Sequence, residues 1–150
     1  MPRTYTQLHY HVVFATRHRV PFLSAELVRH LYPLFGAIVR DQGGVVLAVG
    51  GMPDHVHLVV GLRAHPSLAA VVKAIKGCAS HWINQNARPP EPFAWQEGYA
   101  AFTLSPSVLR KALRYVEQQE AHHRRLGFET EMEQLLRRHG LAISATDLDF

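Results

Sequence analysis

Apolar and polar residues alternate along several short stretches of this sequence, and such alternation predicts β-strands. In residues 8–15, every second position from Leu8 to Phe14 is apolar. Three further strands are predicted at residues 45–49, 55–62 and 99–104. The last of these has the weakest pattern. A turn rich in glycine and proline, residues 50–54, is expected between the second and third strands.

The segments between and after these strands have apolar residues at helical spacing instead. Four helices are predicted, at residues 24–42, 67–86, 105–126 and 129–139. Ser24 and Ser67 stand where N-caps are expected, and Pro106 suits a first helical position. Pro33 should kink or divide the first helix, because its ring removes a backbone hydrogen bond. Gly43 should end that helix.

The predicted order is strand, helix, strand, strand, helix, strand, followed by two more helices. This order is typical of the ferredoxin-like, split βαβ fold of the α+β class. Its antiparallel sheet would place residues 8–15 and 55–62 at the centre. A chain of 150 residues is expected to form one domain, residues 1–150. Residues 141–150 have no informative pattern and stay unassigned.

The third predicted strand carries the most informative motif, Pro53-Asp54-His55-Val56-His57-Leu58. Side chains on a strand alternate faces, so His55 and His57 point the same way, with Cα atoms roughly 6–7 Å apart. Apolar residues would lie behind them. Two imidazoles on one face can bind one divalent metal ion and leave other coordination positions open. The alternative is a pair of surface histidines on a half-exposed strand.

Composition and charge narrow the classes of protein that fit. Cys78 is the only cysteine, so no internal disulfide can form, as is usual in a reducing compartment. The N-terminus lacks the apolar core of a signal peptide, and no apolar run is long enough to cross a membrane, so a cytoplasmic protein is expected. Residues 1–90 contain 9 Lys and Arg against 3 Asp and Glu, whereas residues 91–150 contain 7 against 9. This asymmetry favours a polyanionic partner, or else reflects solubility alone.

Five residues are candidates for contacting a nucleic acid. Arg17 and Arg19 follow directly on the first strand, where a loop could bind phosphate. Lys73 and Lys76 lie three residues apart on the second predicted helix, and Trp95 lies in the proline-rich loop 87–98. Trp95 could stack on a base. The alternatives are a solvated turn, exposed lysines, and a tryptophan packed at the edge of the domain.

The helix predicted at residues 105–126 contributes a second group of candidates. Tyr115 and Gln119 lie four residues apart and would share one face. His122 and His123 follow and could join that face.

Together these motifs resemble a known family. The His-Val-His motif resembles that of the HUH nucleases, and Tyr115 with Gln119 resembles the tyrosine helix of their single-tyrosine transposases. Residues 10–17, 68–80, 95–102 and 119–123 resemble the same family, so the likeness runs from about Thr6 to Gly140. These enzymes move bacterial insertion sequences as single-stranded DNA. One departure is Thr16-Arg17-His18-Arg19, where the family usually has Thr-Lys-Tyr-Arg.

The resemblance implies a set of roles. Tyr115 would be the nucleophile, and His55, His57 and Gln119 would bind magnesium or manganese. The enzyme would cleave and rejoin single-stranded DNA at hairpin-flanked ends through a 5′-phosphotyrosine intermediate. Members are usually homodimers, in which the tyrosine helix of one subunit can complete the metal site of the other.

Other functions fit parts of the sequence. A domesticated relative could act on repeated palindromes of its host with the same residues. A non-catalytic nucleic-acid-binding module on a ferredoxin-like sheet is a second alternative. Such sheets bind RNA through aromatic residues on their central strands, and residues 55–62 have none. A structural or interaction protein would not require Tyr115, His55 and His57 together.

Overall fold

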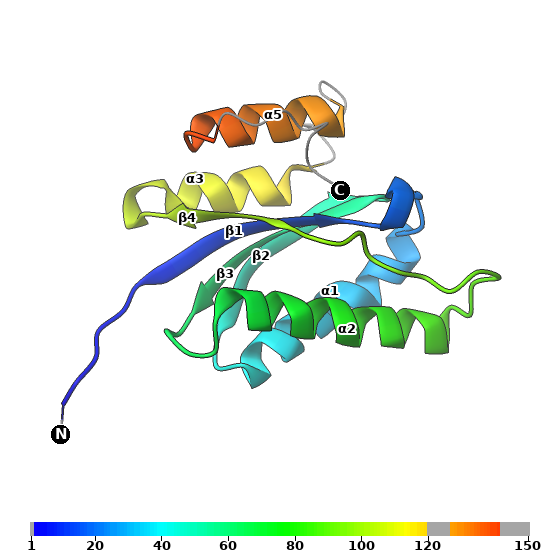
Figure 1. Ribbon diagram of the computed structural model, residues 1–150, viewed down its shortest axis with the longest axis horizontal. Helices are drawn as coiled ribbons and strands as arrows, with labels where there is room; N and C mark the ends of the chain where they lie inside the picture. Colours follow the sequence, from blue (N-terminus) through cyan, green and yellow to red (C-terminus); the bar gives the residue numbers. More distant parts are fainter. Residues whose placement is uncertain (1, 120–126, 142–150) are drawn as a thin grey trace.

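The computed structural model describes residues 2–119 and 127–141. Its centre is one four-stranded sheet in which every neighbouring pair of strands is antiparallel (Figure 1). The strands are β1 (Leu8–Ala15), β2 (Val45–Met52), β3 (His55–Leu62) and β4 (Ala100–Leu104). Their order across the sheet is β2-β3-β1-β4. The predicted α+β, ferredoxin-like fold is therefore confirmed, with β1 and β3 at the centre.

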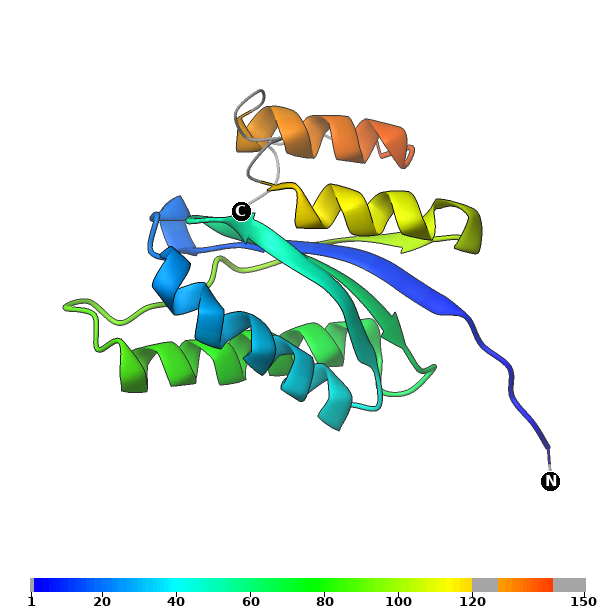
Figure 2. The same cartoon turned by 180° about the vertical axis from the view of Figure 1, so that it is seen from behind.

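Helices cover both faces of the sheet (Figures 1 and 2). One face carries α1 (Ala25–Asp41) and α2 (Leu68–Asn86), and the other carries α3 (Pro106–Glu117) and α5 (Phe128–Arg138). A short 3₁₀ helix, η1 (Arg17–Arg19), follows β1. None of the described helices has the length and apolar character needed to cross a membrane.

The helix boundaries follow local signals closely. The Ser24 side chain accepts a hydrogen bond from the Leu27 N–H, and Ser67 caps α2 in the same way. Pro33 lies inside α1, which is one continuous helix, so the predicted division is wrong. Losing one hydrogen bond at a proline costs about 3 kcal/mol. Burying the side chains of Leu31 and Phe35 on either side of it contributes about 1.5–3 kcal/mol each.

The second strand is longer than predicted. Gly50 and Gly51, expected in a turn, pair with His57 and Val56 as part of β2. Glycine is required at position 50 for packing, because a Cβ there would lie 2.1 Å from the carbonyl oxygen of Val116 on α3. The close approach of α3 to the sheet at Gly50 determines the position of the residues around Val116.

Three clusters of buried apolar residues hold the described helices on the sheet. The largest joins the sheet to α1 and α2, a second includes Val13 and the α5 residue Met132, and a third includes Val59 and the α3 residue Val116. Helix α3 ends at Glu117 and Gln118 forms a turn, so the helix predicted at residues 105–126 is interrupted there, and its residues 120–126 lie outside the described part of the chain. The buried side chain of Gln119 follows directly. His122 and His123 lie outside the described residues.

Candidate active site

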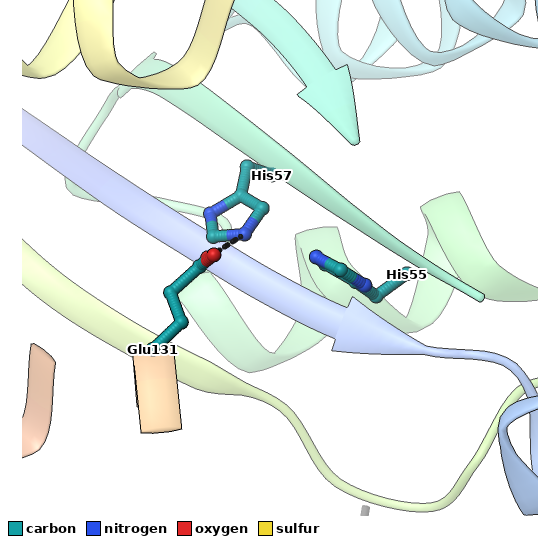
Figure 3. Close-up of side chains that lie close together, drawn as sticks. All are labelled: His55, His57 and Glu131. Carbon is teal, nitrogen blue, oxygen red and sulfur yellow. Dashed lines mark ion pairs between the residues drawn. The ribbon is translucent and has the colours of Figure 1, made fainter. Parts of the chain in front are cut away.

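The two histidines of β3 lie side by side on one face of the sheet (Figure 3). Their ring centroids are 5.2 Å apart, and both side chains are 0% exposed. The intervening Val56 and the following Leu58 point the other way, into the core against α1 and α2. The alternation of faces is therefore as predicted, and the two histidines are buried rather than on the surface.

Hydrogen bonds fix one nitrogen of each ring. The Nδ1 atom of His55 lies 2.7 Å from Oδ1 of Asp54, and the Nδ1 atom of His57 lies 2.7 Å from Nε2 of His11 on β1. Burial, with the adjacent His57, lowers the pKa of His11 well below its usual value, so this ring is neutral. With both Nδ1 atoms engaged, a ligand would approach each ring at Nε2.

A third residue, Glu131 of α5, completes this group. One of its carboxylate oxygens lies 2.7 Å from Nε2 of His57, and Glu131 is itself buried (Figure 3). The ligand atoms of His55, His57 and Glu131 all lie within 4.8 Å of one another, so these residues could hold a metal ion. Two imidazoles and a carboxylate are a common donor set for divalent metals.

Sequence reasoning missed Glu131. Within residues 129–139 it looks like an acid in the first turn of a helix, which is favoured there by the helix dipole. The chain positions of Glu131 and His57 are 74 residues apart, and only the packing of α5 on the sheet brings them together. No motif or spacing in the sequence signals this contact.

Tyr115 on α3 and Gln119, two residues beyond the end of α3, lie near the same place. The Tyr115 ring lies 5.9 Å from the His57 ring, centroid to centroid, within the same chain. The surroundings of Tyr115 raise its pKa: burial contributes most, followed by the negative charge of Glu131 and a hydrogen bond with that carboxylate. A hydrogen bond from Gln119 acts in the opposite direction.

Gln119 is the second polar side chain of this group with an unusual environment. It is 1% exposed, and its Nε2 donates to the backbone oxygen of Tyr115. Its Oε1 atom is buried and has no hydrogen-bond partner among the described residues. A buried carbonyl oxygen without a partner is costly, unless something else binds there. The structure thus places Tyr115 beside His57 and Gln119 beside Tyr115, and adds Glu131 to the group.

Comparison with known proteins identifies the family that has this fold and these motifs. Residues 4–119 match the sequence model described as "Transposase IS200 like". The chain belongs to this IS200-like transposase family. Over 118 residues it is 25% identical to the ISDra2 transposase TnpA of Deinococcus radiodurans, covering 75% of this chain and 84% of that relative. Membership places the chain among enzymes that cleave DNA and transfer strands in transposition.

Solved structures show the same fold. A crystal structure of a transposase from Deinococcus radiodurans R1 is 27% identical, with a TM-score of 0.63 over 79% of this chain and 96% of that one. A REP-associated tyrosine transposase, solved with a REP hairpin bound, has a TM-score of 0.62 over 82% of this chain and 73% of its own. At 17% identity, this second likeness concerns the fold alone.

In this IS200-like transposase, the first predicted pair of DNA contacts lies close to the histidines. Arg17 and Arg19 form η1, at the end of β1. Arg17 is exposed, whereas Arg19 is half-buried and its Nη2 atom lies 2.6 Å from Oε1 of Glu129 on α5. The Arg19 guanidinium also lies over the ring of Phe128, 5.4 Å from its centroid.

The remaining predicted contacts lie on the other side of the sheet, around α2. Lys73, Lys76 and Trp95 line a cavity of about 470 Å³ between α2 and the loop before β4. Lys76 donates hydrogen bonds to the carbonyl oxygens of Gln96 and Gly98, so its ammonium holds that loop. Trp95 is only 7% exposed and packs edge-on against aromatic core residues. Packing at the domain edge thus describes Trp95 here, and base stacking by it stays a prediction.

Proposed function

We propose that this IS200-like transposase is a metal-dependent enzyme that cleaves and rejoins single-stranded DNA at hairpin-flanked ends. The observation that carries the proposal is the position of Tyr115, which lies within hydrogen-bonding reach of Glu131 and beside His57. A hydroxyl nucleophile next to a potential metal centre is the arrangement that phosphoryl transfer without a nucleotide cofactor requires. The solved relative with a bound REP hairpin has the same fold, which supports a DNA hairpin as partner.

A divalent ion fits the residues that would hold it. One ring nitrogen of His55 and one of His57 would bind it, and the buried Oε1 of Gln119 is an acceptor without a hydrogen-bond partner among the described residues. The Glu131 carboxylate is a further oxygen ligand in the arrangement described here. Oxygen and imidazole donors suit magnesium or manganese. When bound, such an ion would withdraw charge from the scissile phosphate and stabilise the charge that develops there.

The chain's own residues would carry the transfer. The Tyr115 hydroxyl loses its proton, and its oxygen forms a bond to the phosphorus while the bond to the 3′ oxygen breaks. The products are a 5′-phosphotyrosine and a free 3′ hydroxyl. Because one phosphodiester replaces another, the reverse attack by a 3′ hydroxyl can rejoin DNA. Gln119 would assist, since its hydrogen bond to Tyr115 favours the phenolate.

The test is a denaturing gel of the protein with labelled single-stranded DNA from both flanks of its own gene, with and without Mg²⁺ or Mn²⁺. We expect a metal-dependent covalent band that disappears in Tyr115→Phe, because that variant loses only the nucleophilic oxygen. Tyr115→Phe should still bind DNA in a native gel. A covalent band that persists in Tyr115→Phe would rule out this nucleophile.

A further inference from the structure

Helix α5 lies on the same side of the sheet as α3 (Figure 1), and its first turns contact the two histidines of β3. The Phe128 ring is 4.3 Å from the His55 ring, centroid to centroid, and Glu131 meets His57. Both histidines are fully buried as a result. A phosphodiester group of DNA has no access to these imidazoles while α5 occupies this position.

The same helix also engages a cation proposed to contact DNA. Glu129, in the first turn of α5, pairs with Arg19 at 2.6 Å, and Phe128 lies under the same guanidinium. Carboxylate and phosphate groups present oxygen atoms to a guanidinium in similar geometry. Glu129 on Arg19 and Glu131 on His57 therefore place negative oxygen atoms at two neighbouring points of the proposed DNA surface.

We propose that α5 is an internal competitor of single-stranded DNA. Its Glu129 and Glu131 carboxylates occupy the positions that two phosphate groups of the bound strand take, one on Arg19 and one at the histidine centre. When the strand binds, α5 leaves this face, and a phosphate oxygen replaces the Glu131 carboxylate. This inference rests on the proposed function, because it assigns the same face to DNA.

The contacts that hold α5 in place are consistent with a helix that can be displaced. It has 11 residues, and helices of that length are marginal without tertiary packing. Its buried side, which includes Met132 and Leu135, packs on Val13 and Phe102 of the sheet. The Arg19–Glu129 pair is partly exposed, with side chains 33% and 55% accessible. An exposed ion pair of this kind contributes little free energy to the packing of α5 on the sheet.

Single substitutions separate the competitor role from general effects of charge. Glu129→Gln removes the carboxylate from Arg19, and Glu26→Gln is the matched control, with the same change of charge at an exposed position of α1, on the other face of the sheet. We measure the affinity for labelled single-stranded DNA from the gene's flanks by fluorescence anisotropy in EDTA. Glu129→Gln should bind about two- to fivefold more tightly, the range expected from an exposed ion pair. Glu26→Gln should bind like the unmodified protein.

Met132→Ala tests the apolar packing between α5 and the sheet. Met132 is fully buried and lies outside the proposed catalytic group. We expect this variant to bind DNA more tightly than Glu129→Gln does. Removing buried apolar packing destabilises the position of α5 on the sheet more than removing an exposed ion pair does. Circular dichroism would show whether the variant is folded. Equal DNA affinity in the unmodified protein, Glu129→Gln and a folded Met132→Ala would overturn the inference.

Hydrogen–deuterium exchange on the unmodified protein gives an independent answer. Backbone amides of α5 should exchange faster when the single-stranded DNA is added. DNA binding with unchanged or slower exchange in α5 would contradict the competitor role. Release of α5 without any covalent band would instead support the inference and refute the proposed tyrosine chemistry. Absence of DNA binding by all three variants and the unmodified protein would refute both.

Discussion

The Nε2 atom of His11 lies 2.7 Å from the Nδ1 atom of His57, and both side chains are buried. The contact joins the two central strands, β1 and β3, which pair antiparallel. A neutral imidazole has one donor and one acceptor nitrogen, so one ring of this pair donates the hydrogen bond and the other accepts it. It also holds the His57 ring with Nε2 directed at Glu131.

We predict that His11→Ala weakens metal binding about 10- to 100-fold, the usual effect of removing a partner that orients a ligand. Isothermal titration of Mn²⁺ into the DNA-free protein measures this directly. His9→Ala is the matched control, because His9 precedes His11 by two positions on β1 and its backbone pairs with Gly61 and Leu104, away from His57. His11→Gln should recover part of the affinity. Unchanged Mn²⁺ affinity in His11→Ala would contradict the orienting role.

The location of Tyr115 beside His57 of the same chain predicts catalysis within one subunit. Tyr115→Phe and His57→Ala should each abolish the covalent DNA adduct, the first by loss of the nucleophile and the second by loss of a metal ligand. A mixture of the two variants should also form no adduct. Recovery of adduct in the mixture would show that a homodimer shares its active sites, and light scattering would establish whether dimers are present.

Gly50→Ala should displace α3 from the sheet, because the new methyl group would lie 2.1 Å from the Val116 carbonyl oxygen. Overpacking of this kind typically costs about 1–3 kcal/mol of stability. We expect a lower unfolding free energy in urea, and a large loss of adduct because Tyr115 moves with α3.

Gly77→Ala is the control for Gly50→Ala. A Cβ at Gly77 meets no atom within 4 Å, and the residue lies inside α2. Alanine there should raise the unfolding free energy by about 0.5–1 kcal/mol through helix propensity. Similar losses of adduct in both variants would show that the close approach at Gly50 is unimportant.

Stability at alkaline pH should depend on Tyr32. Burial raises the pKa of Tyr32 to about 12, whereas its pKa in the unfolded chain is about 10. The unfolded chain therefore loses this proton first, and stability falls as pH rises from about 10 to about 12. Tyr32→Phe should show a shallower fall in the unfolding free energy over this interval. The unfolding free energy of both proteins is measured by urea unfolding at each pH. Parallel pH dependences for the two proteins would contradict the role of Tyr32.

Several features of this protein follow from local signals in the sequence. The alternation in residues 8–15 and 55–62 predicted the two central strands, and Ser24 and Ser67 marked the starts of two helices. The same alternation placed His55 and His57 on one face. These predictions succeed because side-chain periodicity and capping depend on neighbouring residues alone.

Other features depended on contacts between distant segments. Pro33 stays within a continuous helix because burial on both sides of it outweighs its missing hydrogen bond. Gly50 belongs to a strand because α3 approaches the sheet there, and Glu131 reaches His57 only through the packing of α5. Trp95 packs against Phe14 and Phe93 for the same reason. Thus the sequence by itself determined the elements and the histidine and tyrosine motifs. The tertiary structure decided which side chains meet, since contact between residues far apart in the chain arises only from packing.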